Sequence, residues 1–297
     1  MSTRARGIGL AFVTALVSGV SIYVNGRAVK HFGDATVYTT AKNAVAGGLL
    51  LALALVPIGP RVVVPPGRRQ RAGLAVIAVV GGSVPFVLFF EGLARAHATQ
   101  AAFIQKTLVV WVALLAVPSL RERFRIPHAL AIGLLIAGQA WLAGHLGTVA
   151  FGTGEAMILA ATLLWAVEVV VAKRLLGSIS ARALGAARMA LGTVLLLGWL
   201  AVSHKLDALV RLDAGQWRWA LVTGLLLTAY VGTWFAALAR AQAVDVTAVL
   251  VFGAFVTALL SGAVDGASFS AVGAGLVVAG SALVGWTAAR RPTVVAA

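Results

Sequence analysis

The sequence predicts an all-α membrane protein whose ten transmembrane helices form two inverted five-helix repeats, with both termini in the cytoplasm. Three observations lead to this fold class: the composition, ten apolar segments of membrane-spanning length, and an internal repeat. Hydrophobic residues make up 61% of the 297 residues, charged residues only 11%, and the mean hydropathy is +0.98. A soluble domain could not cover so much apolar surface with polar groups, and a disordered chain would be far more polar.

Ten apolar segments have the length of a membrane span, because a helix crosses the hydrocarbon core with roughly 20 residues. The strands of an outer-membrane barrel would instead alternate apolar and polar residues over about 10 residues. Proline marks the connections: Pro118 ends the fourth segment and Pro127 opens the fifth. The segments are 7–25, 35–56, 72–94, 99–119, 127–146, 152–173, 183–203, 217–238, 245–264 and 269–288.

Basic residues fall unevenly on the two sides that these segments define. The side that holds the N-terminus carries 15 Lys and Arg, the opposite side carries 6, and Lys42, Lys106 and Arg188 lie within segments. Cytoplasmic loops are enriched in Lys and Arg, so this asymmetry places both termini in the cytoplasm. The net charge of +15 is therefore an orientation signal and does not indicate a nucleic-acid partner.

The chain repeats itself at an offset of about 145 residues. Residues 90–98 read FEGLARAHA and residues 235–243 read FAALARAQA, with six of nine positions identical. Further on, residues 133–140 (GLLIAGQA) match residues 275–282 (GLVVAGSA) at an offset of 142. Two matches in the same order at nearly the same offset indicate a duplicated chain.

The duplication divides one membrane domain into a first repeat, residues 1–148, and a second repeat, residues 149–297. Each repeat holds five segments, an odd number, so the second copy enters the membrane from the opposite side. Many secondary transporters use such inverted repeats to build alternating access around a site at the membrane midplane. A duplication that has no transport consequence is the alternative.

These features together resemble the drug/metabolite transporter superfamily, and within it the EamA-type ten-helix exporters. The resemblance rests on five plus five spans, the Ala-Arg-Ala ending at 94–96, the Arg-Glu-Arg turn at 121–123 and the glycine-rich last span. Lys42 and Arg188 occupy matching places in the second span of each repeat, where the family typically has an arginine. The turn at 265–267, Asp-Gly-Ala, departs from the pattern.

Within the superfamily the pattern looks most like the YddG-type exporters of aromatic amino acids in bacterial inner membranes. The resemblance implies export of amino acids by alternating access through a central cavity, with the lipid bilayer and a small-molecule substrate as partners. Related branches export threonine, cysteine derivatives or cationic drugs, and these substrates are the alternative. A monomer is the simplest expectation, and no cofactor is implied.

Charged residues within the spans are candidates for gates or ion pairs, because a charge inside a membrane is costly and usually faces protein or water. The direction of each span gives their depth. Three lie toward the outside and two toward the cytoplasm: Lys42, Glu91 and Lys106, then Glu168 and Arg188. The outer charges also have an explanation without a gate. Glu91 can pair with Arg95 four residues on, and the Lys42 side chain can extend toward the membrane interface.

Aromatic and polar side chains at helical spacing suggest a site for a zwitterion that carries a ring. Lys106 could attract its carboxylate, and aromatic faces could attract its ammonium group. The alternative is that these aromatic residues only pack between helices. The candidate substrate-binding residues are Tyr23, Gln100, Lys106, Thr107, Trp111, Trp165, Tyr230 and Trp234.

Pro85 is the one proline well inside a predicted span, and two glycines and a serine precede it. Proline removes a backbone hydrogen bond and kinks a helix. The third span could therefore carry a hinge at Pro85, or a static kink.

An enzyme is not expected. The five histidines lie at predicted span ends or loops, no two are four residues apart, and there is no H-E-x-x-H sequence. The chain has no cysteine and no G-x-x-x-x-G-K-[ST] motif, so metal thiolate sites and ATP-driven transport by this chain are not expected either.

Overall fold

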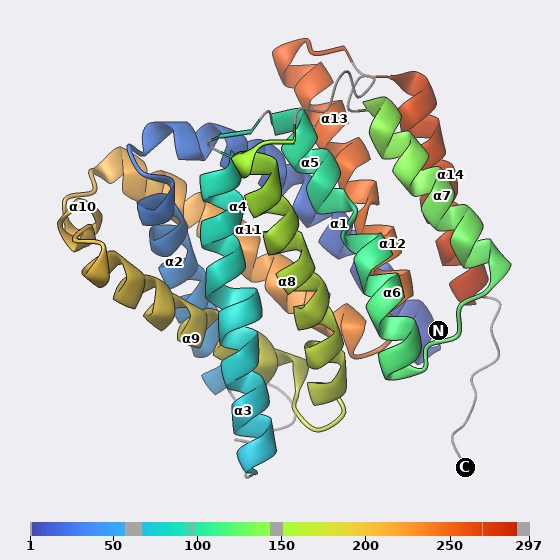
Figure 1. Ribbon diagram of the computed structural model, residues 1–297, viewed down its shortest axis with the longest axis horizontal. Helices are drawn as coiled ribbons and strands as arrows, with labels where there is room; N and C mark the ends of the chain where they lie inside the picture. Colours follow the sequence, from blue (N-terminus) through green and yellow to red (C-terminus); the bar gives the residue numbers. More distant parts are fainter. Residues whose placement is uncertain are drawn as a thin grey trace.

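The computed structural model describes residues 2–56, 67–93, 95–96, 98–142, 151–268 and 270–289, and it is built from helices. Figure 1 shows them packed side by side as a single bundle, with α7 and α14 together at one edge. The first repeat contributes α1 (Thr3–Ala28), η1 (Val29–His31), α2 (Ala35–Leu55), α3 (Arg68–Ile77), η2 (Ala78–Ser83), α4 (Val84–Leu93), α5 (Ala98–Lys106), α6 (Leu108–Leu120) and α7 (Ile126–Leu142). The second contributes α8 (Thr153–Leu175), α9 (Ala181–Val202), α10 (Leu206–Val210), α11 (Ala214–Leu238), α12 (Ala243–Leu250), α13 (Phe252–Asp265) and α14 (Ala271–Ala289).

Eight helical segments in the described part of the chain are long and apolar enough to cross a membrane, where the sequence predicts ten. The remaining two predicted spans correspond to shorter apolar helices, Ile126–Leu142 and Ala271–Thr287. The end of the predicted 127–146 span lies outside the described residues. These two shorter helices pack against each other, and Gly138 and Gly273 allow a close approach because a Cβ at either would meet the other's carbonyl oxygen at 2.9 Å.

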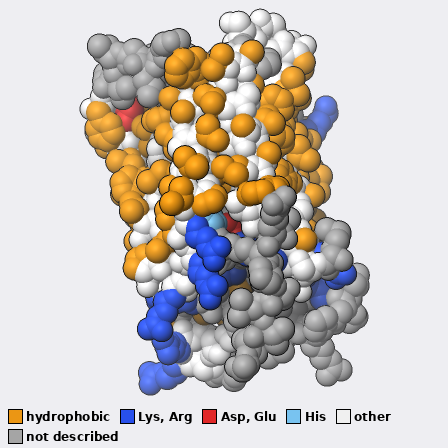
Figure 2. All heavy atoms as spheres, turned by 90° about the vertical axis from the view of Figure 1, so that its right-hand side faces the viewer, with side chains coloured by type: hydrophobic (Ala, Val, Ile, Leu, Met, Phe, Trp, Pro, Cys, Tyr) orange, Lys and Arg blue, Asp and Glu red, His pale blue; other side chains and the backbone are white. Residues whose placement is uncertain are grey.

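The surface agrees with a membrane-spanning bundle. Large apolar side chains are exposed along several helices, among them Leu114 (60% exposed), Val194 (64%) and Val202 (75%). In Figure 2 hydrophobic side chains cover the upper and middle parts of one face, whereas Lys and Arg gather mainly toward its lower end. An apolar belt of this kind suits lipid, because a soluble monomer rarely exposes large contiguous apolar patches.

Helix packing repeats between the two halves. Helix α1 packs on α11 and α13, and its counterpart α8 packs on α4 and α6. Helices α2 and α9, the second spans of the two repeats, pack on each other. These packed pairs of helices are equivalent in the two repeats, as expected for a duplicated chain.

Glycines near the start of each repeat fit onto the Ala-Arg-Ala sequence of the other. A Cβ at Gly7 would lie 2.8 Å from the Arg240 Cβ and 3.0 Å from the Ala241 Cβ. A Cβ at Gly154 would lie 3.0 Å from the backbone carbon of Arg95 and 2.9 Å from the nitrogen of Ala96. The FEGLARAHA and FAALARAQA match therefore marks two equivalent contact surfaces between the halves.

Helix breaks also recur at the repeat offset. The fourth predicted span is interrupted at Thr107, between α5 and α6, and the ninth is interrupted at Val251, between α12 and α13. At the ends of α6 and α13 the chain turns through left-handed residues at equivalent positions, Arg121 (φ 53°) and Gly266 (φ 66°). Glycine adopts this conformation without steric cost. Gly266 therefore allows the turn at 265–267, although this turn lacks the Arg-Glu pair found at 121–122.

Candidate functional site

A cavity of about 270 Å³ lies between the two repeats. Its walls come from α1, α2, α4, α5, α6, α8, α9 and α11. On α1 the lining runs from Ser18 to Gly26, the half of that helix farther from the N-terminus. Six of the predicted site residues contribute to the lining: Lys42, Trp165, Glu168, Arg188, Tyr230 and Trp234.

Glu168 and Arg188 form a buried ion pair in the wall of the cavity. Arg188 donates from Nε to Oε1 and, over 3.0 Å, from Nη2 to Oε2 of Glu168, the two-pronged geometry that suits a guanidinium. Both side chains are at most 6% exposed. Gly81 on η2 makes room for the pair, because a Cβ there would lie 2.2–2.6 Å from the Glu168 carboxylate.

Lys42 is the counterpart of Arg188 in the first repeat, and its environment is different. Its Nζ donates to Oδ1 of Asn25 over 3.0 Å and lies 4.1 Å from the ring centre of Phe90 and 5.0 Å from that of Tyr38. Among the described residues no acidic side chain lies within 4.0 Å of Lys42. The residue matching Glu168 at the offset of 145 is Tyr23, a phenol in place of a carboxylate.

Asn25 holds Lys42 in position. Its amide nitrogen donates to Ser21, over 2.6 Å to the carbonyl and 2.8 Å to the hydroxyl, which leaves its oxygen facing Lys42 and the Tyr38 hydroxyl. This polar group was not predicted from the sequence. The spacing of Ser18, Ser21 and Asn25 along an apolar helix, three or four residues apart, is the signal that could have found it.

Aromatic rings cover much of the remaining wall. The Trp165 ring meets Phe86 edge-on at 5.6 Å and lies 5.5 Å from Phe89 between ring centres. On α11, Tyr230 and Trp234 stack with their planes 10° apart. The three phenylalanines of α4 that line the cavity, Phe86, Phe89 and Phe90, were also missed, although their spacing places them on one helix face.

Two charged residues that the sequence assigned to different depths line the same cavity. Lys42, expected with Glu91 and Lys106 toward the outside, faces the same cavity as Arg188: the Lys42 Nζ and the Arg188 Cζ lie 5.7 and 5.5 Å from the ring centre of Phe86. Glu91 instead accepts from Arg95 over 2.6 Å and from Thr36 over 3.0 Å. The local pairing of Glu91 with Arg95, which the sequence offered as the alternative, is therefore present.

Thr107 and Trp111, predicted binding residues of the fourth span, lie outside the cavity lining. Ala101, Gln105 and Leu108 line the cavity instead, and Leu108 is one residue beyond Thr107. One residue along a helix is a rotation of about 100°, and packing against α8 and α12 sets this rotation. Thr107 and Trp111 hydrogen-bond to each other over 3.1 Å outside the lining, and the side chain of Gln100 lies outside the described residues.

Two other predicted binding residues lie away from the cavity lining. Lys106 is 4% exposed, and its Nζ has no hydrogen-bond partner within the described part of the chain. The Arg27 guanidinium lies over the ring of Tyr23, 4.4 Å from its centre, and also forms an ion pair with Asp265.

Pro85 follows a π-helical segment, η2, and lies at the second residue of α4. Because proline has no N–H, the carbonyl of Gly81 four residues earlier loses its α-helical partner, and Trp165 Nε1 lies within 3.4 Å as a donor to it. The Ser83 hydroxyl donates to the carbonyl of Ala78 over 2.9 Å. Single π-turns are frequent at functional sites, and this one adjoins Glu168 and Trp165.

This arrangement can bind a small solute with both polar and apolar parts. A buried cation, a buried ion pair and several aromatic faces converge on one space, as in small-molecule sites that combine apolar walls with a few polar groups. No group of titratable side chains with the spacing of a metal site occurs among the described residues.

Comparison with known proteins gives the family. The EamA-like transporter family model matches residues 5–144 and again residues 152–286. A solved structure entitled "Crystal structure of protein" matches over 92% of this chain and 97% of its own, with a TM-score of 0.75 and 16% identity, which shows likeness of fold alone. No curated protein matches the chain.

The family belongs to the drug/metabolite transporter superfamily and consists of transporters, not enzymes. Membership makes this a multi-pass membrane protein for secondary transport of small solutes. The comparisons single out no branch, so the YddG-type assignment stays a prediction. Because the family model matches each half in turn and covers most of the chain, the protein belongs to the EamA-like transporter family.

Proposed function

We propose that the protein exports amino acids, and aromatic ones in particular, across the bacterial inner membrane by alternating access through the cavity described above. In this proposal the chain crosses the membrane ten times as two inverted five-helix repeats, with both termini in the cytoplasm. The division of Lys and Arg, 15 on the side of the N-terminus against 6, supports the orientation.

The observation that carries the substrate proposal is the different charge balance of Lys42 and Arg188. Arg188 has a carboxylate partner, whereas among the described residues Lys42 contacts only the neutral Asn25 oxygen and aromatic rings. A buried cation without a counter-charge is costly unless a ligand supplies one. Lys42 is therefore placed to bind the carboxylate of a substrate, the role that the sequence analysis gave to Lys106.

The rest of an aromatic amino acid has complementary surroundings. Its ring fits against the rings of Phe86, Phe89 and Trp165, since aromatic pairs favour the edge-on and offset geometries already present in this wall. Its ammonium group can lie over the stacked rings of Tyr230 and Trp234. The volume of about 270 Å³ suits a single small solute.

The test is uptake of labelled solutes into liposomes that contain the purified protein. The panel comprises an aromatic, an aliphatic and a hydroxyl-bearing amino acid, the amide of the aromatic one and a cationic drug, each with and without a pH gradient. We expect saturable uptake of the aromatic amino acid and weak uptake of its amide, which lacks the carboxylate. Preference for the threonine-like amino acid or the cationic drug would replace the proposed substrate.

Two lysine variants identify the carboxylate site. Lys42→Met should lower uptake of the amino acid by about 10- to 100-fold, as loss of a hydrogen bond to a charged group does. Lys106→Met is the matched control, because Lys106 is equally buried but lies outside the lining. A loss confined to Lys106→Met would assign the carboxylate to Lys106 and contradict the role of Lys42.

A further inference from the structure

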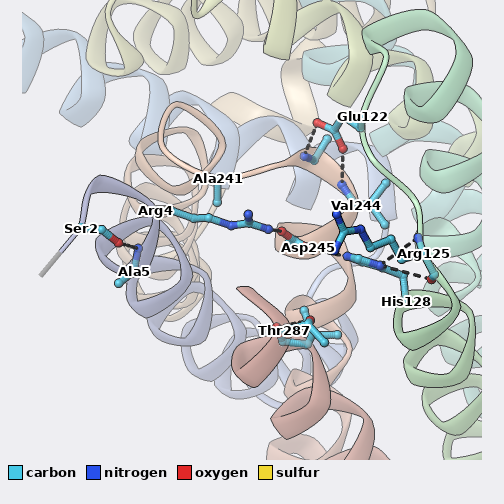
Figure 3. A network of polar contacts seen from close by, with 12 residues as sticks. Ser2, Arg4, Ala5, Glu122, Arg125, His128, Ala241, Val244, Asp245 and Thr287 are labelled. Carbon is cyan, nitrogen blue, oxygen red and sulfur yellow. Dashed lines mark hydrogen bonds and ion pairs between the residues drawn. The ribbon is translucent and has the colours of Figure 1, made fainter. Parts of the chain in front are cut away.

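The turn between α11 and α12, residues 239–242, is held by charged side chains that come from other elements (Figure 3). Lys173, near the end of α8, donates over 2.5 Å to the carbonyl of Leu238 and over 2.6 Å to that of Ala241. Glu122, which follows α6, accepts from the backbone nitrogens of Ala243 (2.7 Å) and Val244 (3.1 Å). The two side chains thus bind the last carbonyl of α11, a carbonyl of the turn, and the N–H groups that begin α12.

Asp245, in the first turn of α12, extends this arrangement to two more helices. It is fully buried and forms an ion pair with Arg4 of α1, and its Oδ1 lies 3.3 Å from Nε2 of His128 on α7. We call these five side chains, Arg4, Glu122, His128, Lys173 and Asp245, the clamp. The clamp ties α1, α7, α8 and the segment after α6 to one turn of the second repeat.

The clamp lies at the end of the bundle that the cavity does not reach. The lining begins on α1 at Ser18, and toward the N-terminus the helix is packed: Thr14 donates to the Thr233 hydroxyl over 2.9 Å, and Gly7 fits against the Ala-Arg-Ala turn. From Ser18 the lining runs toward Gly26, at the opposite end of α1. The clamp therefore closes the end away from the lined half of α1.

The described residues form no equivalent clamp at the other end. At the offset of 145, the positions matching Lys173, Glu122 and Asp245 hold Ala28, Ala267 and Gln100. The ion pairs that are present there have exposed members: both side chains of the Arg27–Asp265 pair are more than 40% exposed, against 21% and 0% for Arg4 and Asp245. Exposed pairs contribute little, whereas separating the members of a buried pair is strongly unfavourable.

We propose that the clamp is the gate at the N-terminal end of the bundle and that it sets the resting state, with that end closed and the cavity directed to the opposite side. Opening to the cytoplasm then requires separation of Asp245 from Arg4 and His128. The clamp residues have no counterparts at the equivalent positions of the other repeat. Opening the N-terminal end of the bundle therefore costs more free energy than opening the other end. This inference rests on the alternating access proposed above but not on the identity of the substrate.

The test measures the access of water-soluble reagents from each side of the membrane. The chain has no cysteine, so an introduced one is the sole thiol. Thr14→Cys reports on the closed segment between cavity and clamp, and Gly26→Cys reports on the cavity, where a Cβ meets nothing within 4 Å. Each is labelled in oriented liposomes with a membrane-impermeant maleimide, with and without Asp245→Asn.

We expect Asp245→Asn to raise the labelling rate of Thr14→Cys from the N-terminal side by about tenfold and to lower that of Gly26→Cys from the other side. Arg4→Gln should act in the same direction, and it provides the test if Asp245→Asn does not fold. Asp265→Asn is the matched control, because it breaks the exposed pair with Arg27 at the other end.

Unchanged labelling in folded Asp245→Asn or Arg4→Gln protein would overturn the gate, as would an equal rise in Asp265→Asn. Labelling needs no substrate, so this result is separate from the uptake panel. Clamp-dependent labelling without amino-acid uptake would contradict the substrate alone, and uptake with clamp-independent labelling would contradict the gate alone.

Discussion

Lys42 and Arg188 occupy the same place in the two repeats and face the same cavity, yet one is neutralised by the protein and the other is not. Arg188 makes a two-pronged ion pair with Glu168, whereas Lys42 donates to an amide oxygen and is surrounded by rings. The two repeats hold cations at equivalent positions, but the position that holds the Glu168 carboxylate in the second repeat holds the Tyr23 phenol in the first. In the proposed function the Arg188–Glu168 pair stabilises the structure, and Lys42 binds the ligand.

Removal of one charge from each site gives the largest expected difference. Glu168→Gln leaves Arg188 buried without its counter-charge and should reduce stability by about 3–5 kcal/mol. Lys42→Met removes a cation that has no counter-charge, so its stability should match or exceed that of the parent. Thermal unfolding in detergent, followed by tryptophan fluorescence, measures both, and equal losses of stability would show that the two cations are equivalent.

Crowding the ion pair without removing a charge gives a smaller effect. Gly81→Ala places a methyl group at 2.2–2.6 Å from the Glu168 carboxylate and should cost about 1–3 kcal/mol, the usual range for overpacking. Gly48→Ala on α2 is the matched control, because a Cβ there meets nothing within 4 Å and alanine favours the helix. If both variants unfold at the same temperature, η2 shifts to accommodate the methyl group and does not constrain the Glu168–Arg188 pair.

Pro85 tests whether the neighbouring π-turn moves during transport. At the repeat offset its counterpart is Tyr230, within the regular helix α11, so the irregularity belongs to one repeat only. We expect Pro85→Ala to lower the maximal uptake rate by about two- to tenfold and to leave the apparent affinity unaltered. Unchanged rates together with unchanged labelling from both sides would establish a static kink.

The smallest effect is expected at an ion pair outside the spans. Burial alone would raise the pKa of Asp34, but the hydrogen bonds from Lys205 and from the Val37 and Thr36 nitrogens hold it below its usual range. The hydrogen bond to Asp34 raises the pKa of Lys205 above its usual range.

The signs of these shifts define a pH window. The contribution of Asp34 is present above its unfolded pKa of 3.8 and is lost as the pH falls through the lower folded value. The contribution of Lys205 is present below 10.5 and is lost as the pH rises through the higher folded value. Asp34→Asn should therefore cost less than about 1 kcal/mol at pH 7, measured by thermal unfolding, and nothing once the pH is well below the folded pKa of Asp34. A larger loss of stability at pH 7 would mean that the partly exposed Asp34–Lys205 pair contributes as much as the buried Glu168–Arg188 pair.

The sequence predicted the apolar spans and the repeat because both depend on local composition and on comparison of the chain with itself. It also identified residues of the second repeat that line the cavity, such as Trp165 and Tyr230, because their spacing places them beside Glu168 and Trp234. Glycine contacts between distant helices were not predictable, because they depend on how the helices approach.

The errors have a physical reason. The face that a helix turns inward is set by tertiary packing, so Gln105 and Leu108 line the cavity and the predicted Thr107 and Trp111 do not. Asn25 and Ser21 were overlooked because short polar side chains barely change the hydropathy of a span. The clamp joins residues as distant as Arg4 and Asp245, and no local pattern indicates such a pairing.

The fit of Gly7 against Arg240 has a consequence for how the protein is made. These residues are 233 positions apart, and at a synthesis rate of about 5–20 residues per second the ribosome needs roughly 12–47 s to pass from one to the other. During that interval the first helix must remain in the membrane without its final neighbour. The time needed to synthesise the chain up to Arg240, and not the hydrophobicity of the first helix, therefore determines when this helix can pack against its final neighbour.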